Sequence, residues 1–200
     1  ILRGDAVIFI DPKGSDRMYK AFCRACEKAD RGKPLRFHPG NRSKTDGIRF
    51  DVTAVFSTGA QIATRVMSVV PGEDNVFKQF AWSCIKTFAD AMIELGEKPS
   101  LKSLSQNINK GIEDLLRALI LQAVKQHADT DWREQAESFL PARRENCTDA
   151  IHELNVLVSW YENVLPAYLH TMVVGECLKI FHHSKEHYSK ITATLMPIFA

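Results

Sequence analysis

The stretch 75-NVFKQFAWSCIKTFADAMIELG-96 decides the fold of most of this chain. Its apolar residues fall on every side of a helix rather than on one stripe, which is typical of a helix buried at the centre of a domain. Gly96 follows as the residue that ends such a helix. The sequence therefore predicts a central helix over residues 75–95, with an apolar surface made of Val76, Phe77, Phe80, Trp82, Ile85, Phe88, Met92 and Leu95.

Further amphipathic segments lie on both sides of this helix. Before it, Ser57 is expected to cap a helix that presents Ile62, Val66 and Val69 on one side and stops at Pro71. After it, we expect helices over 101–108, after Gly111, over 129–140 and over 147–165, and one or two more in the remainder. The apolar stripes that predict the longer two consist of Ile112, Leu115, Leu116, Leu119, Ile120 and Ala123, and of Ile151, Leu154, Val158, Tyr161 and Leu165.

The beginning of the chain has a different pattern. Residues 6–10, AVIFI, form a continuous, β-branched apolar run, as in a strand buried on both faces of a parallel sheet. Pro12 ends the strand, and Ser15 or Asp16 can cap a helix that Gly32 closes. Residues 35–39, LRFHP, are consistent with a second short strand. Strand, crossover helix and strand make a βαβ unit, so a fragment of an α/β sheet is predicted to carry a larger helical body.

The composition limits the classes of protein. No apolar run approaches the roughly 20 residues that span a bilayer, and five cysteines at irregular spacing indicate a reduced, cytoplasmic protein. The net charge of +2 is uneven along the chain. Residues 1–50 hold twelve Lys and Arg against six Asp and Glu, a net charge of +6, whereas the remainder holds fourteen against eighteen, or −4. A basic first quarter could face phosphates, and it could equally be a solvated helix surface.

Three stretches carry a resemblance to a known family. They are RGDAVIFIDPKGSDRMYKAFCRACEKADRGKPLRFHPG, then TGAQIATRVMSVVPGEDNVFKQFAWSCIKTFADAMIELGEKPSLKSL, and finally HYSKITATLMPIF. They resemble the TraD/TraG-type coupling proteins of conjugation and type IV secretion, within the FtsK/HerA-like class of hexameric DNA pumps. The likeness is good over residues 3–104 and 186–198 and thin between them.

The resemblance implies a fold and a role. The chain would be a central fragment, mainly α. Residues 1–55 would be a strand-helix-strand piece of a RecA-like α/β nucleotide-binding domain. Residues 56–200 would be an all-α domain of about six to eight helices, inserted after that piece. The all-α domain would recognise the relaxase–DNA complex (relaxosome) or another secreted cargo protein on the cytoplasmic side. The parent would be an ATP- and Mg-dependent DNA translocase, a hexamer anchored in the inner membrane that meets the channel components of type IV secretion.

The resemblance also points to Asp11 and Lys13 as nucleotide-cleft candidates in the intact parent. They follow a strand at the carboxyl edge of a sheet, where open α/β folds bind ligands. Lys13 could face a phosphate and Asp11 a metal or a water, although Asp-Pro-Lys-Gly is also good turn chemistry. The chain contains no G-x-x-x-x-G-K-[ST] motif and no apolar strand ending in Asp-Glu, so it lacks Walker A and Walker B. We therefore expect no catalytic residue, no cofactor and no ATP hydrolysis in this fragment.

Two other readings of the sequence remain. A direct DNA-binding module would use the basic first quarter together with a loop pair, through Arg17, Lys20, Arg24, Lys28, Arg31, Arg143 and Arg144. A remote alternative is a zinc hydrolase, because HSKEH at residues 183–187 matches H-x-x-E-H. His183 and His187 would lie one helical turn apart and make weak metal candidates. A polar helix surface explains the same residues.

Overall fold

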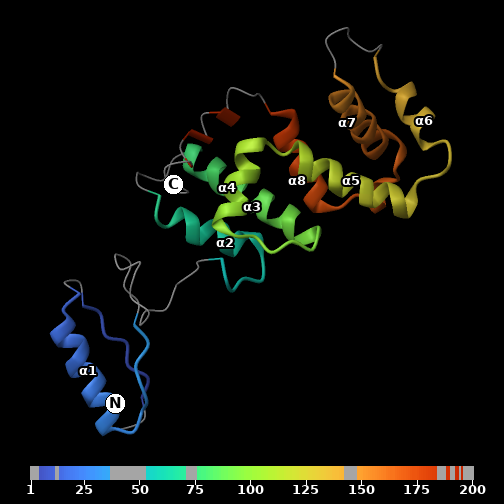
Figure 1. Cartoon of the computed structure of the whole chain (residues 1–200). Coiled ribbons are helices and arrows are strands. Elements are labelled where there is room, and N and C mark those ends of the chain that lie inside the picture. Colours follow the sequence, from blue (N-terminus) through green and yellow to red (C-terminus); the bar gives the residue numbers. More distant parts are fainter. Residues whose placement is uncertain are drawn as a thin grey trace. The chain divides into compact units, whose positions relative to one another are not determined.

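The computed structural model describes residues 5–11, 14–36, 53–70, 76–141, 148–183, 188–189, 192–193 and 195. Contacts divide the chain into two units, Ile1–Asp51 and Val52–Ala200. The described residues are mainly helical, as predicted, and none of them lies in a regular strand (Figure 1). Their α-helices are α1 (Asp16–Lys28), α2 (Gly59–Met67), α3 (Val76–Glu94), α4 (Leu101–Lys110), α5 (Glu113–His127), α6 (Trp132–Ser138), α7 (Asp149–Ser159) and α8 (Met172–His182).

The first unit is built around α1. Ser15 caps this helix as predicted, because its hydroxyl accepts a hydrogen bond from the Met18 N–H. Figure 1 shows extended chain running beside the helix. Phe9 in that extended chain stacks on Phe22 of α1, with ring centroids 5.7 Å apart. The predicted crossover helix is thus present, with one apolar side against the preceding segment.

The predicted strand over residues 6–10 is wrong for this chain. The segment is extended but unpaired, and its side chains are exposed, with Ile8 at 90%. Of the second predicted strand, Leu35 is exposed and Arg36 forms only an isolated bridge, while residues 37–39 lie outside the described part. A strand buried on both faces needs neighbouring strands to pair with it and helices to cover both faces. The described residues supply only α1, which contacts the segment through Phe22, and no regular strand.

The second unit has its core around α3. This helix packs against α2, α4, α5 and α8, so the predicted central helix is confirmed. Ile85, Phe88 and Met92 are fully buried in it. The first turn differs from the prediction, since Val76 and Phe77 are exposed. The apolar residues of α3 therefore belong to the core, or pack against it, from the second turn of the helix onward.

The ends of the helices follow local chemistry. Ser100 forms a capping box with Ser103 at the start of α4, and the chain turns at Gly96 with φ of 76°, as expected. At α2 the cap is Thr58 rather than the predicted Ser57, because the Thr58 hydroxyl accepts from the Gln61 N–H. The capping residue is thus one position later than the sequence pattern suggested.

The helices α6 and α7 form a hairpin at one end of this unit, with α5 leading to it (Figure 1). Trp132 and Trp160 meet edge to face at 6.1 Å, and Arg133 holds Glu153 through two hydrogen bonds of 2.8 and 2.7 Å. The predicted stripe of residues 147–165 is buried except for Ile151, which is exposed. After α7 the chain continues as a π-helix, η1 (Trp160–Val164), then a short 3-10 helix, η2 (Ala167–Leu169), before α8.

Candidate functional site

The basic residues of α1 lie along one face of the helix. Positions 17, 20, 24 and 28 are separated by three, four and four residues, and a helix of 3.6 residues per turn brings such positions into line. All four side chains are exposed. Phe22 and Cys26 lie on the opposite side, where the helix meets the extended segment. The structure thus brings together Arg17, Lys20, Arg24 and Lys28, which we call the α1 basic stripe. Arg31, also predicted as a DNA contact, lies beyond the end of α1 and donates a hydrogen bond of 3.3 Å to the Asp5 carbonyl oxygen of the extended segment.

Asp11 has a local role in the structure. Its carboxylate accepts a hydrogen bond of 2.6 Å from the Ser15 N–H, and its carbonyl accepts one of 3.1 Å from the Gly14 N–H. These bonds close the turn that leads into α1, with Gly14 at φ of 64°. The other nucleotide-cleft candidate, Lys13, lies outside the described residues.

Three further candidates also lie outside the described part of the chain, namely Arg143, Arg144 and His187. His183 is described: it follows α8, is exposed, and its ring meets the ring of Phe80 edge to face at 4.8 Å. Within the described ranges, no group of three or more His, Cys, Asp and Glu could hold a metal ion. The predicted zinc site at the H-x-x-E-H motif, residues 183–187, therefore stays untested, because Glu186 and His187 lie outside the described residues.

The sequence reasoning missed a cleft between α3 and α8. It measures about 470 Å³ and is lined by Phe80, Ser83, Thr87, Glu176, Lys179, Ile180, His182 and His183. A pocket of about 40 Å³ shares Thr87 and Glu176 with it and is completed by Lys86, Asp90, Met172 and Val173. We call the two together the α3–α8 groove. The sequence signal for this cleft was that polar residues of α3 recur at spacings of three and four, which indicates one partly polar face on an otherwise apolar helix.

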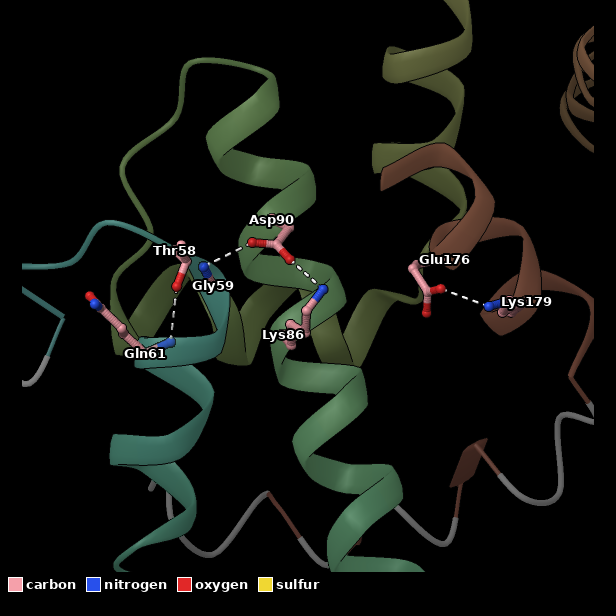
Figure 2. Close-up of polar contacts among 7 residues, drawn as sticks. All are labelled: Thr58, Gly59, Gln61, Lys86, Asp90, Glu176 and Lys179. Atoms are coloured by element: carbon pink, nitrogen blue, oxygen red, sulfur yellow. Dashed lines mark hydrogen bonds and ion pairs between the residues drawn. The ribbon is translucent and has the colours of Figure 1, made fainter. Parts of the chain in front are cut away.

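The two ion pairs beside this groove come from different helices (Figure 2). On α3, Lys86 Nζ lies 2.7 Å from Asp90 Oδ2, and on α8, Lys179 Nζ lies 2.7 Å from Glu176 Oε1. The Gly59 N–H of α2 donates to Asp90 Oδ1 at 2.8 Å, which places a carboxylate at the positive end of α2. Asp90 therefore fixes the crossing of α2 and α3.

The buried thiols of these helices are poor nucleophiles. Burial raises the pKa of Cys84 in α3 and of Cys177 in α8 to about 12. A thiol with so high a pKa is almost entirely protonated at neutral pH, and only the thiolate reacts or binds a metal. Burial likewise raises the pKa of the Tyr188 phenol, which donates a hydrogen bond to the Ile108 carbonyl. These groups serve packing rather than chemistry.

Comparisons with models of protein families, with curated proteins and with solved structures find no match to this chain. None of the helices in the described ranges is long and apolar enough to cross a membrane.

Proposed function

We propose that the helical unit is the cargo-recognition domain of a conjugative DNA-transfer coupling protein. In this proposal its partner is the relaxase–DNA complex or another protein secreted by a type IV system. The sequence resemblance over residues 3–104 and 186–198 motivates the assignment. One structural observation supports it most: a helical unit with its own core follows a segment of sheet-like sequence that is uncovered in this chain.

In the same proposal, residues 1–55 belong to a RecA-like nucleotide-binding domain. The apolar side chains of residues 6–10 would be covered when that segment pairs with further strands of the parent protein. The turn held by Asp11 would then lie at the carboxyl edge of the sheet, facing bound nucleotide. ATP and Mg would be bound by Walker motifs elsewhere in the parent, a membrane-anchored hexamer, and the helical unit would take no part in hydrolysis.

Binding to a relaxase–DNA complex tests the proposal. The chain would be immobilised and offered a relaxase covalently attached to its cleaved oligonucleotide, the relaxase alone, and the oligonucleotide alone. We expect saturable binding of the two relaxase samples that changes little between 50 and 200 mM salt, because contacts between apolar surfaces are only weakly screened. Absence of binding to every relaxase sample from the element that encodes the chain would refute the proposal.

Direct binding of DNA is the second candidate, and the α1 basic stripe favours it. The stripe extends over residues 17–28, or about 16 Å of helix, and presents four exposed cations on one face. Contacts with several backbone phosphates release counterions, so affinity would fall by about 10³-fold or more between 50 and 200 mM salt. Undetectable affinity for mixed-sequence DNA at 50 mM salt would eliminate this candidate. The salt dependence thus separates the two functions.

A further inference from the structure

The four cations of the α1 basic stripe are not used inside the protein. Within the described part of the chain, none of their side chains makes an ion pair or a hydrogen bond. The other two described arginines of the first unit are engaged, since Arg36 lies 3.0 Å from Asp16 and Arg31 donates to the Asp5 carbonyl. The charge of the stripe can therefore act on an external ligand.

The stripe lies opposite the packed side of α1. The half-buried and buried side chains of this helix are Tyr19, Phe22, Cys23 and Cys26, whose spacing places them on one face. Both aromatic rings are engaged on that face. Phe22 stacks on Phe9, and the Arg36 guanidinium lies 4.4 Å from the centre of the Tyr19 ring. The face that α1 turns to solvent is thus the charged one.

Positive charge is in excess along this exposed face. The sequence of α1 contains two carboxylates, Asp16 and Glu27, and Asp16 is already paired with Arg36. Four cations against the one remaining carboxylate leave a net charge of +3. This excess is spread over about 16 Å of helix. A ligand with negative charges repeated along a line matches such a face.

The small residues beside the stripe limit the class of ligand. Ala21 and Ala25 flank it, and Met18, the exposed large apolar residue of α1, lies beyond them. Protein interfaces have an apolar core, helices on membranes place Trp, Phe or Leu beside their cations, and single strands stack their bases on exposed aromatic rings. Tyr19 and Phe22 are on the opposite face. Binding to duplex phosphates requires only the cations.

We propose that the α1 basic stripe binds the phosphate backbone of duplex nucleic acid without reading its sequence, and binds a duplex in preference to a single strand. Each strand of duplex DNA carries one phosphate per 3.4 Å of its axis, so the stripe faces about five phosphates of one strand. Contacts to phosphates position a protein but carry no sequence information. This inference rests on direct DNA binding, the second candidate function, because it names the kind of nucleic acid that α1 binds.

Fluorescence anisotropy of the full chain at 50 mM salt tests the inference. The probes are two labelled duplexes of about 20 base pairs with unrelated sequences, and a single strand of the same length. We expect the duplexes to bind within about twofold of each other and about tenfold more tightly than the single strand, because a duplex has more condensed counterions to release. Equal or tighter binding of the single strand, or a tenfold difference between the duplexes, overturns the inference.

Variants and a competitor locate the contact. Lys20→Gln and Arg24→Gln each remove one charge from the stripe and should weaken duplex binding by about fivefold or more. Lys102→Gln and Lys125→Gln remove the same charge from exposed positions of α4 and α5 and should leave the affinity unchanged. Equal losses for the two pairs, or displacement of the duplex by polyglutamate of equal total charge, overturns the inference.

The outcomes separate this inference from the two functions. If DNA binds but the single strand binds as tightly as the duplexes, the inference is refuted while the second candidate function stands. If no DNA binds at 50 mM salt, both of these are refuted, and the cargo-recognition proposal still depends on the relaxase samples alone. If the duplexes bind as expected but no relaxase sample binds, the inference stands and cargo recognition is refuted.

Discussion

Residues 5–36 and residues 53–195 make opposite use of their apolar side chains. In the first stretch Ile8, Ile10 and Leu35 face solvent, and one helix provides the only regular structure among the described residues. In the second, side chains from seven α-helices and η1 form one continuous core around α3. A helix satisfies its own backbone hydrogen bonds, whereas a strand depends on neighbours. The difference indicates that the helical unit builds its core from its own residues, whereas the apolar side chains of Ile8, Ile10 and Leu35 are left uncovered within the described part of the chain.

The largest expected effect compares two isoleucines. Ile85→Ala removes a fully buried side chain from α3 and should cost about 2–5 kcal/mol of unfolding free energy, because it leaves a cavity in the core. Ile8→Ala changes a side chain that is almost fully exposed and should shift the same free energy by less than about 0.5 kcal/mol. Urea unfolding followed by circular dichroism measures both. Similar losses of unfolding free energy for the two variants would contradict the difference between the buried core and the exposed segment.

The crossing of α2 and α3 tests how closely the helical unit is packed. A methyl group on Gly59 would overlap Asp90 Oδ1 and lie 2.7 Å from the Lys86 carbonyl oxygen, so Gly59→Ala should cost about 1–3 kcal/mol. Gly175 of α8 has open space around the same position, and Gly175→Ala should stabilise the unit by about 0.5–1 kcal/mol. Thermal unfolding should move in opposite directions for the two variants. A shift in the same direction would contradict the close approach at Gly59.

Two serine caps extend the comparison to the helix ends. Ser100→Ala removes the capping box of α4 and should lower the stability of the helical unit by about 1 kcal/mol. Ser15→Ala removes the same kind of cap from α1, and we expect it to fray that helix without moving the urea midpoint of the helical unit. Backbone amide NMR can follow both helices separately. An equal shift of the midpoint by Ser15→Ala would show that the two units unfold as one.

The smallest effect concerns the α6–α7 hairpin. The hydrogen bonds from Arg133 hold the pKa of Glu153 below its ordinary value. A carboxylate with a lowered folded pKa stabilises the fold above about pH 5 and loses that contribution as pH falls below about 4. Because the pair is partly exposed, Glu153→Gln should cost less than about 1 kcal/mol at pH 7 and progressively less as pH falls through the lowered pKa of Glu153. Glu134→Gln on α6 is the control, and a cost of Glu153→Gln that stays unchanged down to the lowest pH at which the protein folds would rule out the ion pair as its source.

The helical part of this fold follows from local sequence. Several local features can be recognised in the sequence because each depends on residues within a few positions of one another. They are the helix caps Ser15 and Ser100, the end of α3 at Gly96 and the buried surface of α3. The strand over residues 6–10 was misjudged because apolar β-branched residues specify a strand only where partners exist. The α3–α8 groove was missed for a related reason. It depends on how two helices separated by about 80 residues meet, and periodicity within one helix does not encode that contact.

Hydrogen exchange of the whole chain tests most directly whether the helical unit is self-sufficient and the extended segment is not. The account predicts slow exchange, close to the global unfolding free energy, for the amides of α3 and α5, and exchange near the unprotected rate for residues 6–10. Strong protection of residues 6–10 in this chain would mean that they are paired without further partners. That result would contradict the account and remove the main structural support for placing them in a larger sheet.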